Sequence, residues 1–132
     1  MPKLSSKVFD PQKHLLQGKE NERLARALMA LDSCYKDWVI TLSFYSAVHY
    51  IYSKLSTLEV PHTHEDAKPI ILKDCGISVF KIYSNLSDKS RNARYYPILA
   101  ETYRRSPVVA IDALISLDKL KVELGIKDSI LK

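Results

Sequence analysis

The sequence predicts an all-α protein: an up-and-down antiparallel bundle of four long helices plus one short helix. Only three glycines occur among 132 residues, too few for the tight turns that a fold of many short strands requires. No stretch alternates apolar and polar residues as a half-buried strand does. The segment DWVITLSFYSAVHYIY instead repeats large side chains at spacings of four, three, four and three, which places them on one helix face. These residues are Trp38, Leu42, Tyr45, His49 and Tyr52.

The first helix is predicted to begin at Asp10 and Pro11, because aspartate is a preferred N-cap and proline fits the first helical position. Gly18 marks a point where this helix could be interrupted. Asp32 and Ser33 break the pattern at its end. The apolar stripe that predicts its buried side consists of Leu24, Ala27, Leu28 and Leu31.

The second and longest helix is expected to cover about residues 34–58. A short, imperfect helix over residues 64–75 is expected to follow the loop PHTH. Thr63 and Asp66 resemble a capping box at its start, and Gly76 closes it.

Two further long helices complete the predicted bundle. The first covers residues 77–95 and is stopped by Pro97, after which residues up to 105 form a connection. Ser106 and Pro107 then start the last helix, which Gly125 ends. The predicted core positions of residues 77–95 are Val79, Ile82, Tyr83 and Leu86. Those of the last helix are Val108, Ile111, Leu114, Ile115, Leu117, Leu120 and Leu124.

Composition indicates one ordinary globular domain, which we take as residues 1–132. The hydrophobic fraction is 46% and the charged fraction 27%, as in water-soluble proteins. No apolar run approaches the ~20 residues that span a bilayer. The N-terminus MPKLSSKVFD lacks the apolar core of a secretory signal, so we expect a cytoplasmic protein with no membrane partner. In that reducing compartment Cys34 and Cys75 are expected to be buried thiols rather than a disulfide.

The positive charge is concentrated in one segment. Residues 81–105 hold six basic and two acidic residues, a local net charge of +4 within a total of +5, together with half of the eight tyrosines. Basic side chains interleaved with aromatic rings suit an anionic partner with stackable bases, which favours RNA or a nucleotide. The same pattern also fits a solvated rim whose tyrosines pack inward. The candidate binding residues are Arg91, Arg94, Tyr95, Tyr96, Arg104 and Arg105.

His49 is the candidate catalytic residue. It lies one helical turn from both Tyr45 and Tyr52, and a histidine of near-neutral pKa among hydroxyls can act as an acid or a base. The structural alternative is a core or interface histidine hydrogen-bonded to a neighbour. That alternative is favoured because no carboxylate lies at helical spacing from His49.

His62 and His64 form an H-x-H pair followed by Glu65 and Asp66, and these residue types can bind zinc. No second pair of ligands follows at a recognised separation, and loop solvation and helix capping also explain the four residues. We therefore expect no metal site. Neither glycine-rich phosphate loop, GxxxxGK[ST] or GxGxxG, is present in the sequence, and we expect no cofactor.

Three segments together resemble small bacterial and archaeal HEPN-like proteins: DWVITLSFYSAVHYIY, a loop containing T-H-E, and the helix end I-Y-x-x-L-x-x-x-S-R-N-A-R-Y. The resemblance covers about residues 20–120, and its specific part lies in Trp38–Tyr52, Thr63–Glu65 and Ile82–Tyr95. It implies an up-and-down bundle of four or five helices and, often, a homodimer. Family members commonly work beside a nucleotidyltransferase-type partner in toxin–antitoxin or defence systems, and many are metal-independent ribonucleases.

The chain departs from this family at the catalytic motif, an Arg followed four to six residues later by His. Its last histidine is His64, which precedes every candidate arginine. Tyr96 stands where the histidine could fall after Arg91, and a phenol with a pKa of ~10 is a poor base at neutral pH. We therefore expect a binding or regulatory module for RNA, a nucleotide or a protein partner, and the missing motif argues against enzymatic activity. The alternatives are a divergent metal-independent endoribonuclease that uses Arg91 or Arg94 with His49, and a subunit that makes only protein–protein interactions.

Overall fold

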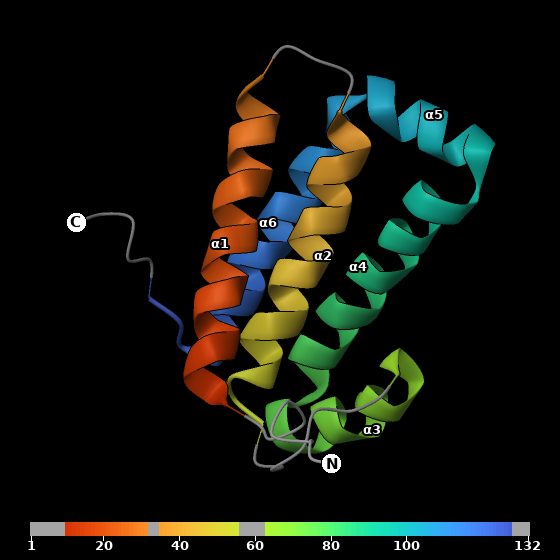
Figure 1. Cartoon of the computed structure of the whole chain (residues 1–132). Helices are drawn as coiled ribbons and strands as arrows, with labels where there is room; N and C mark the ends of the chain where they lie inside the picture. Colours follow the sequence, from red (N-terminus) through yellow and green to blue (C-terminus); the bar gives the residue numbers. More distant parts are fainter. Residues whose placement is uncertain (1–9, 32–34, 56–62, 128–132) are drawn as a thin grey trace, which may run out of the picture.

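The computed structural model describes residues 10–31, 35–55 and 63–127, and all regular structure within these ranges is α-helical. The prediction of an all-α protein is confirmed. Four of the helices are long and two, α3 and α5, are short (Figure 1). They are α1 (Pro11–Ala30), α2 (Lys36–Tyr52), α3 (His64–Cys75), α4 (Ile77–Tyr95), α5 (Pro97–Arg105) and α6 (Pro107–Leu124).

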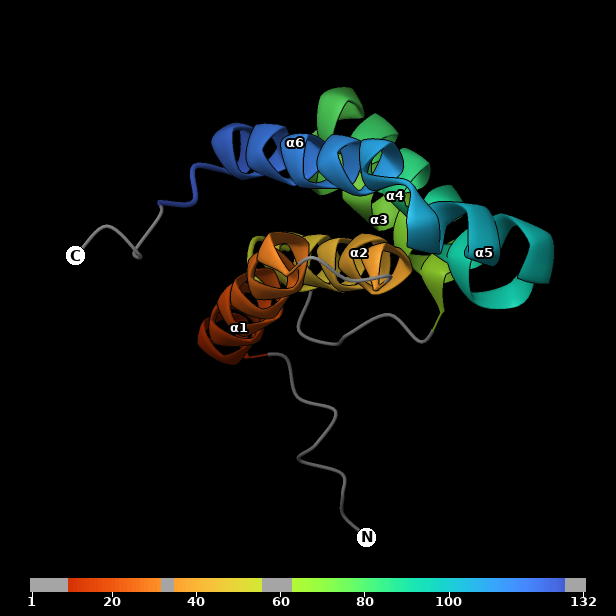
Figure 2. The same cartoon turned by 90° about the horizontal axis from the view of Figure 1, so that it is seen from above.

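Helix α2 lies at the centre of the molecule. The long helices alternate in direction along the chain, and α2 lies between α1 on one side and α4 and α6 on the other (Figures 1 and 2). The short helix α3 lies at one end of the molecule, and α5 lies at the opposite end (Figure 1). None of the helices in the described ranges combines the length and the apolarity needed to cross a membrane.

The central position of α2 explains its composition. Thirteen of its seventeen residues are buried, as expected for a helix that is surrounded by others. The face that the sequence singled out is nevertheless its least buried face. Trp38 is 53% exposed, and Leu42, Tyr45 and His49 are half-buried, whereas Tyr52 is buried. This face therefore leaves several large side chains in reach of a ligand or a partner.

Local capping signals set most of the helix boundaries. The Thr63 hydroxyl accepts a hydrogen bond from the backbone N–H of Asp66 at 3.0 Å, so α3 begins as predicted. Gly76, with a φ of 94°, separates α3 from α4, and Gly125, with a φ of 71°, ends α6 in the left-handed conformation. Ser106 caps the start of α6. The predicted boundaries of 64–75 and 77–95 are confirmed.

Two predicted boundaries are wrong. Residues 97–105 were predicted to be mainly a connection, but they form α5, because Pro97 occupies the first position of a new helix as well as ending α4. Helix α2 ends at Tyr52 rather than near residue 58, and Ser53 and Lys54 form a turn. Residues 34 and 56–58 of the predicted helix lie outside the described ranges.

Helix α1 continues without interruption through Gly18. This glycine does not break the helix but allows a close packing contact with α2. A Cβ built on Gly18 would lie 2.8 Å from the Cδ1 atom of Tyr50 on α2. The Ser46 hydroxyl donates a hydrogen bond to the Gly18 carbonyl at 2.8 Å. The absence of a side chain at Gly18 thus lets the Tyr50 ring lie directly on the α1 backbone.

The predicted apolar stripes of α1 and α6 are only partly buried. Helix α1 packs almost entirely on α2, through the small residues Gly18 and Ala25, and Leu24 and Leu31 of the predicted stripe are 45% and 53% exposed. On α6 the predicted positions divide into two faces. The buried ones include Leu114, Leu117 and Leu120. The exposed ones are Val108, Ile111 and Ile115, and Val122 is exposed as well.

A buried ionic cluster joins α1, α2 and α6. Glu22 of α1 is 2% exposed and accepts hydrogen bonds from Tyr50 Oη at 2.6 Å, Arg26 Nε at 2.8 Å and Lys121 Nζ at 2.9 Å. Arg26 also pairs with Asp118 of α6 at 2.6 Å. Burial by itself raises the pKa of Glu22, but the three donors outweigh it, and the net effect is a lowered pKa. Glu22 is therefore an ionised carboxylate with a full set of partners.

Candidate functional site

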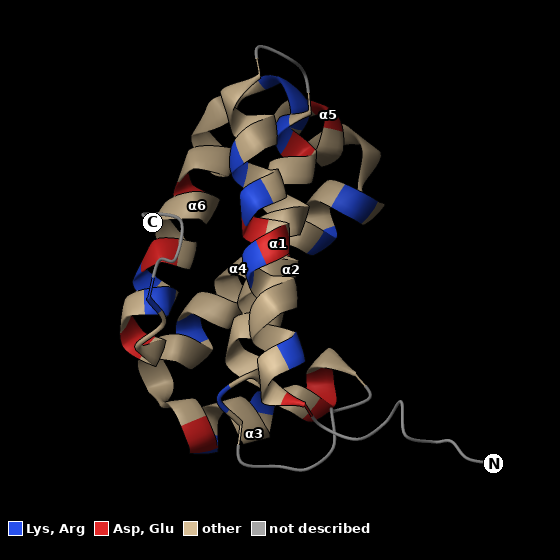
Figure 3. Cartoon of the chain, turned by 60° about the vertical axis from the view of Figure 1, so that its left-hand side comes forward, with Lys and Arg blue, Asp and Glu red and all other residues tan. Residues whose placement is uncertain are grey.

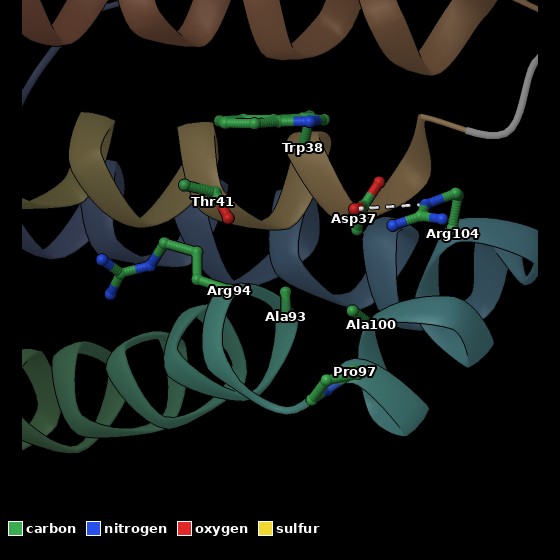
Figure 4. Close-up of a pocket in the computed structure, with 8 residues that line it drawn as sticks. All are labelled: Asp37, Trp38, Thr41, Ala93, Arg94, Pro97, Ala100 and Arg104. Atoms are coloured by element: carbon green, nitrogen blue, oxygen red, sulfur yellow. Dashed lines mark ion pairs between the residues drawn. The ribbon is translucent and has the colours of Figure 1, made fainter.

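A cleft of about 400 Å³ lies between α2 and the elbow formed by α4 and α5. Small side chains make this space, since Ala93, Ala100 and Thr41 leave room that larger residues would fill. Figure 4 shows the residues that line the cleft. Trp38 and Pro97 lie at opposite edges of this set, and Arg94 and Arg104 lie at its two ends. The cleft is lined by Asp37, Trp38, Thr41, Ala93, Arg94, Pro97, Ala100 and Arg104.

Asp37 and Arg104 form one end of the cleft. The Nε atom of Arg104 lies 3.5 Å from Oδ2 of Asp37 (Figure 4), a long contact for an ion pair. Asp37 is only 8% exposed, and its Oδ1 atom is buried without a hydrogen-bond partner within the described ranges. An unsatisfied buried carboxylate oxygen is costly, by about 1–3 kcal/mol or more. This end of the cleft therefore combines a buried carboxylate with the guanidinium of Arg104.

Arg94 forms the other end of the cleft, and its guanidinium is held by several contacts. Nη1 donates to the hydroxyls of Tyr45 at 3.0 Å and Tyr95 at 3.3 Å, while Nε lies within hydrogen-bond distance of the carbonyl and the hydroxyl of Ser90, at 3.3 and 3.2 Å. The guanidinium carbon also lies 4.8 Å from the centre of the Tyr95 ring. Every one of these acceptors is neutral, so the positive charge of Arg94 remains available to an anion.

Trp38 provides a large aromatic surface at the edge of the cleft. It is the only tryptophan of the chain, and 53% of it is exposed. An exposed tryptophan beside arginines is a typical stacking surface for a nucleobase. The spacing of large side chains places Trp38 on the aromatic face of its helix, but it does not relate Trp38 to the arginines of the cleft.

The six residues of the predicted basic and aromatic patch do not all line the cleft. Only Arg94 and Arg104 do so. Arg91 lies 3.5 Å from Asp88, and Arg105 lies 2.9 Å from Glu101, so both have acidic neighbours on their own helices. Tyr95 and Tyr96 are 65% and 52% exposed at the junction of α4 and α5. On the face shown in Figure 3, both basic and acidic segments occur along α1 and α6.

His49 lies in the interface between α1 and α2. Its Nδ1 atom is 3.0 Å from Nδ1 of His14, and the two rings stack with their centres 5.2 Å apart. Tyr52 contacts the His14 ring edge-on. Burial lowers the pKa of both histidines, and the neighbouring His14 lowers the pKa of His49 further. The contacts of His49 match the structural alternative, an interface histidine hydrogen-bonded to a neighbour.

His64, the first residue of α3, is the histidine that the arginines influence. Burial lowers its pKa, and the charges of Arg94, Arg91 and Lys68 lower it further. Its ring packs edge-on against Phe44, with centres 5.1 Å apart, and its Nδ1 atom is buried without a partner in the described ranges. No spacing in the sequence relates His64 to these arginines, because the α3–α4 hairpin brings them together.

The structure describes only some of the other sequence candidates. His62 and Cys34 lie outside the described ranges. Among the described residues, no group of three or more His, Cys, Asp and Glu side chains is arranged to hold a metal ion. Burial, aided by Asp74, raises the pKa of the Cys75 thiol to about 11, which makes it a poor nucleophile at neutral pH.

No protein-family model matches the chain, and neither the curated proteins nor the solved structures that were compared with it give a match. The kind of ligand that the site can bind is therefore indicated by its own residues.

Proposed function

We propose that this protein is a binding module whose cleft between α2, α4 and α5 takes a nucleotide or the end of a single-stranded RNA. The observation that carries the proposal is the combination of two arginines and an exposed tryptophan around one open space, Arg94, Arg104 and Trp38. A volume of about 400 Å³ falls within the ~300–1,000 Å³ of typical small-molecule sites.

The arrangement suggests a division of roles among these residues. Arg94 is positioned by Tyr45 and Tyr95, and its hydrogen-bond partners in the described part of the chain are all neutral, which suits a phosphate group. Trp38 offers a ring for stacking, a contact worth ~1–3 kcal/mol per base. Tyr95 and Tyr96 extend the aromatic surface beyond the cleft, where a second nucleotide of an RNA strand would pass.

Titration of Trp38 fluorescence with nucleotides and with a short single-stranded RNA tests this proposal. Replacing Arg94 or Arg104 by alanine should weaken binding, and each substitution should reduce the slope of log affinity against log salt by about 0.7 for single strands. Arg105→Ala is the matched control, because Arg105 follows Arg104 directly but does not line the cleft and pairs with Glu101. Equal effects of Arg104→Ala and Arg105→Ala, or no binding at low salt, would contradict the proposal.

A metal-independent endoribonuclease is the second candidate, and the position of His64 favours it. An imidazole whose pKa is lowered by burial, and further by the charges of Arg94 and Arg91, can act as a general base on a phosphodiester. RNA cleavage in the presence of a chelator should then fall by ~10²-fold or more in His64→Ala. His49→Ala should have little effect, because His49 packs against His14. A loss of cleavage in His49→Ala, with cleavage retained in His64→Ala, would instead identify His49 as the catalytic residue.

The assembly proposed for the protein is a homodimer of HEPN-like bundles. The alternating long helices and the exposed apolar residues of α6 support this arrangement. A nucleotidyltransferase-type partner in a toxin–antitoxin or defence system remains the biological setting that the resemblance suggests. Co-expression with such a partner, followed by size-exclusion chromatography of the mixture, would test whether the two proteins form a complex. If the protein makes only protein–protein interactions, the cleft should bind no nucleotide.

A further inference from the structure

One face of α6 carries four exposed apolar side chains in a row along the helix. They are Val108, Ile111, Ile115 and Val122, which are 60%, 43%, 47% and 80% exposed. Spacings of three, four and seven residues place them on one side of the helix, away from the leucines that enter the core. Helix α6 lies at the outer side of the molecule (Figure 2). A continuous exposed apolar patch of this kind marks a contact with another protein.

The row is symmetric about Ile115. Val108 lies seven residues before Ile115 and Val122 lies seven residues after it, which is ~10 Å along the axis in each direction. When two copies of a helix pair antiparallel about a two-fold axis, a residue before the centre lies opposite the residue equally far after it in the other copy. An antiparallel pair centred on Ile115 therefore brings Val108 of each copy against Val122 of the other.

Two exposed charges beside the row fit the same arrangement. Asp112 and Lys119 lie on the same flank of the row, about 60° and 40° around the helix from Ile115. Asp112 lies three residues before Ile115, and Lys119 lies four residues after it. In the antiparallel pair Asp112 of each copy thus lies beside Lys119 of the other. The two-fold axis repeats this ion pair, so the surface is complementary to itself in charge.

A groove of about 440 Å³ between α4 and α6 gives room at one end of the row. Ile82 of α4 and Val122 of α6 supply its apolar surface, and Lys81, Lys119 and Glu123 are among its polar residues. Because Val108 of the second copy meets Val122, it lies at this groove.

We propose that this row is the contact surface of a homodimer in which the α6 helices of two copies pack antiparallel about Ile115. The inference rests on the homodimer proposed above and names its surface and geometry. It is separate from nucleotide binding, because no residue of α6 lines the cleft between α2, α4 and α5.

The dissociation constant of the dimer, measured by sedimentation equilibrium of the full chain, tests the charge pair. Lys119→Asp should raise it at least about tenfold at low salt, because an aspartate then faces Asp112 of the other copy at two symmetric places. Asp112→Lys should do the same. The double variant Asp112→Lys/Lys119→Asp should recover most of the affinity, since the charges exchange places. Lys13→Asp makes the same change of net charge on an exposed position of α1, so it is the matched control and should have no effect.

A disulfide tests the centre of the contact. Ile115→Cys should cross-link the two copies under mild oxidation, because facing residues of helices whose axes lie ~8–10 Å apart come within the ~4.4–6.8 Å between Cα atoms that a disulfide spans. Val108→Cys should not cross-link, since its two copies lie ~20 Å apart along the axis. The wild type, which keeps Cys34 and Cys75, is the control.

A dimeric wild type whose affinity is unchanged by both charge reversals would overturn this surface and leave the homodimer itself standing. Cross-linking through Val108→Cys but not through Ile115→Cys would overturn it in the same way. A wild type that is monomeric at high micromolar concentration would overturn the surface and the homodimer together. None of these results changes the titration of the cleft with nucleotides, so the two proposals fail separately.

Discussion

Removing the carboxylate of Glu22 should destabilise this protein more than any substitution of a surface ion pair. The perturbation is Glu22→Ala, at a side chain that is 2% exposed and accepts hydrogen bonds from Tyr50, Arg26 and Lys121. The variant leaves Lys121, itself only 6% exposed, as a buried charge without its carboxylate. Breaking a buried pair in this way costs about 3–5 kcal/mol.

Equilibrium unfolding in urea, followed by circular dichroism, measures this loss. The matched control is Glu20→Ala, since Glu20 pairs with Arg23 on the exposed side of the same helix, and an exposed ion pair contributes little to stability. The double variant Glu22→Leu with Lys121→Met should recover much of the stability, because it removes both buried charges. A loss below about 1 kcal/mol in Glu22→Ala would refute the reasoning.

The same cluster predicts a sensitivity to acid. The folded-state pKa of Glu22 is lowered, so its contribution to stability is present above the unfolded-state pKa of ~4.3 and is lost as the pH falls through the lower folded-state value. Glu22→Gln should therefore reduce the slope of stability against pH below about pH 4. An unchanged slope would mean that Glu22 does not titrate with folding.

Three further predictions concern packing and assembly. His14 and His49 have lowered pKa values when folded, so their interface should lose stability as the pH falls below the unfolded-state value of ~6.5. His49→Phe should reduce that loss in thermal melts between about pH 6.5 and 5, and His14 and His64, whose pKa values are also lowered, should account for the rest. Gly18→Ala should destabilise by about 1–3 kcal/mol in urea unfolding, because its Cβ would lie 2.8 Å from the Tyr50 ring, and a neutral result would contradict the close contact. If the exposed apolar face of α6 forms a dimer, Val122→Glu should shift the mass measured by light scattering toward the monomer's 15.1 kDa, and a monomeric wild type would exclude the dimer.

The fold was predictable from sequence where local chemistry decides it. Thr63, Gly76 and Gly125 act through their own backbone and the residues beside them, so their positions in the chain suffice to place the ends of α3 and α6. Pro97 was misread because a proline fits both the end of one helix and the start of the next. Gly18 was misread because a glycine required by a neighbouring helix has the same sequence signature as a helix break.

The candidate site was predictable only in its basic and aromatic character. Arg94 and Arg104 were identified from charge, but Asp37 lies 57 residues before Arg94 in the chain and joins them only through the packing of α2 on α4 and α5. Whether a carboxylate oxygen lacks a partner is a property of the folded structure that no spacing reveals. The same holds for His64, whose pKa is lowered by burial and by the charges of the arginines in a fold where α3 turns back at Gly76.

The position of α1 has a consequence for local unfolding. This helix packs almost entirely on α2 and meets α6 through the ion pairs of Glu22 and Arg26. Its opening therefore has to break these pairs but does not have to move α4 or α5. A ligand in the cleft would touch α2, α4 and α5 and leave α1 as it was. Amide hydrogen exchange should then slow on binding in α2, α4 and α5, while the exchange of α1 continues at its own rate.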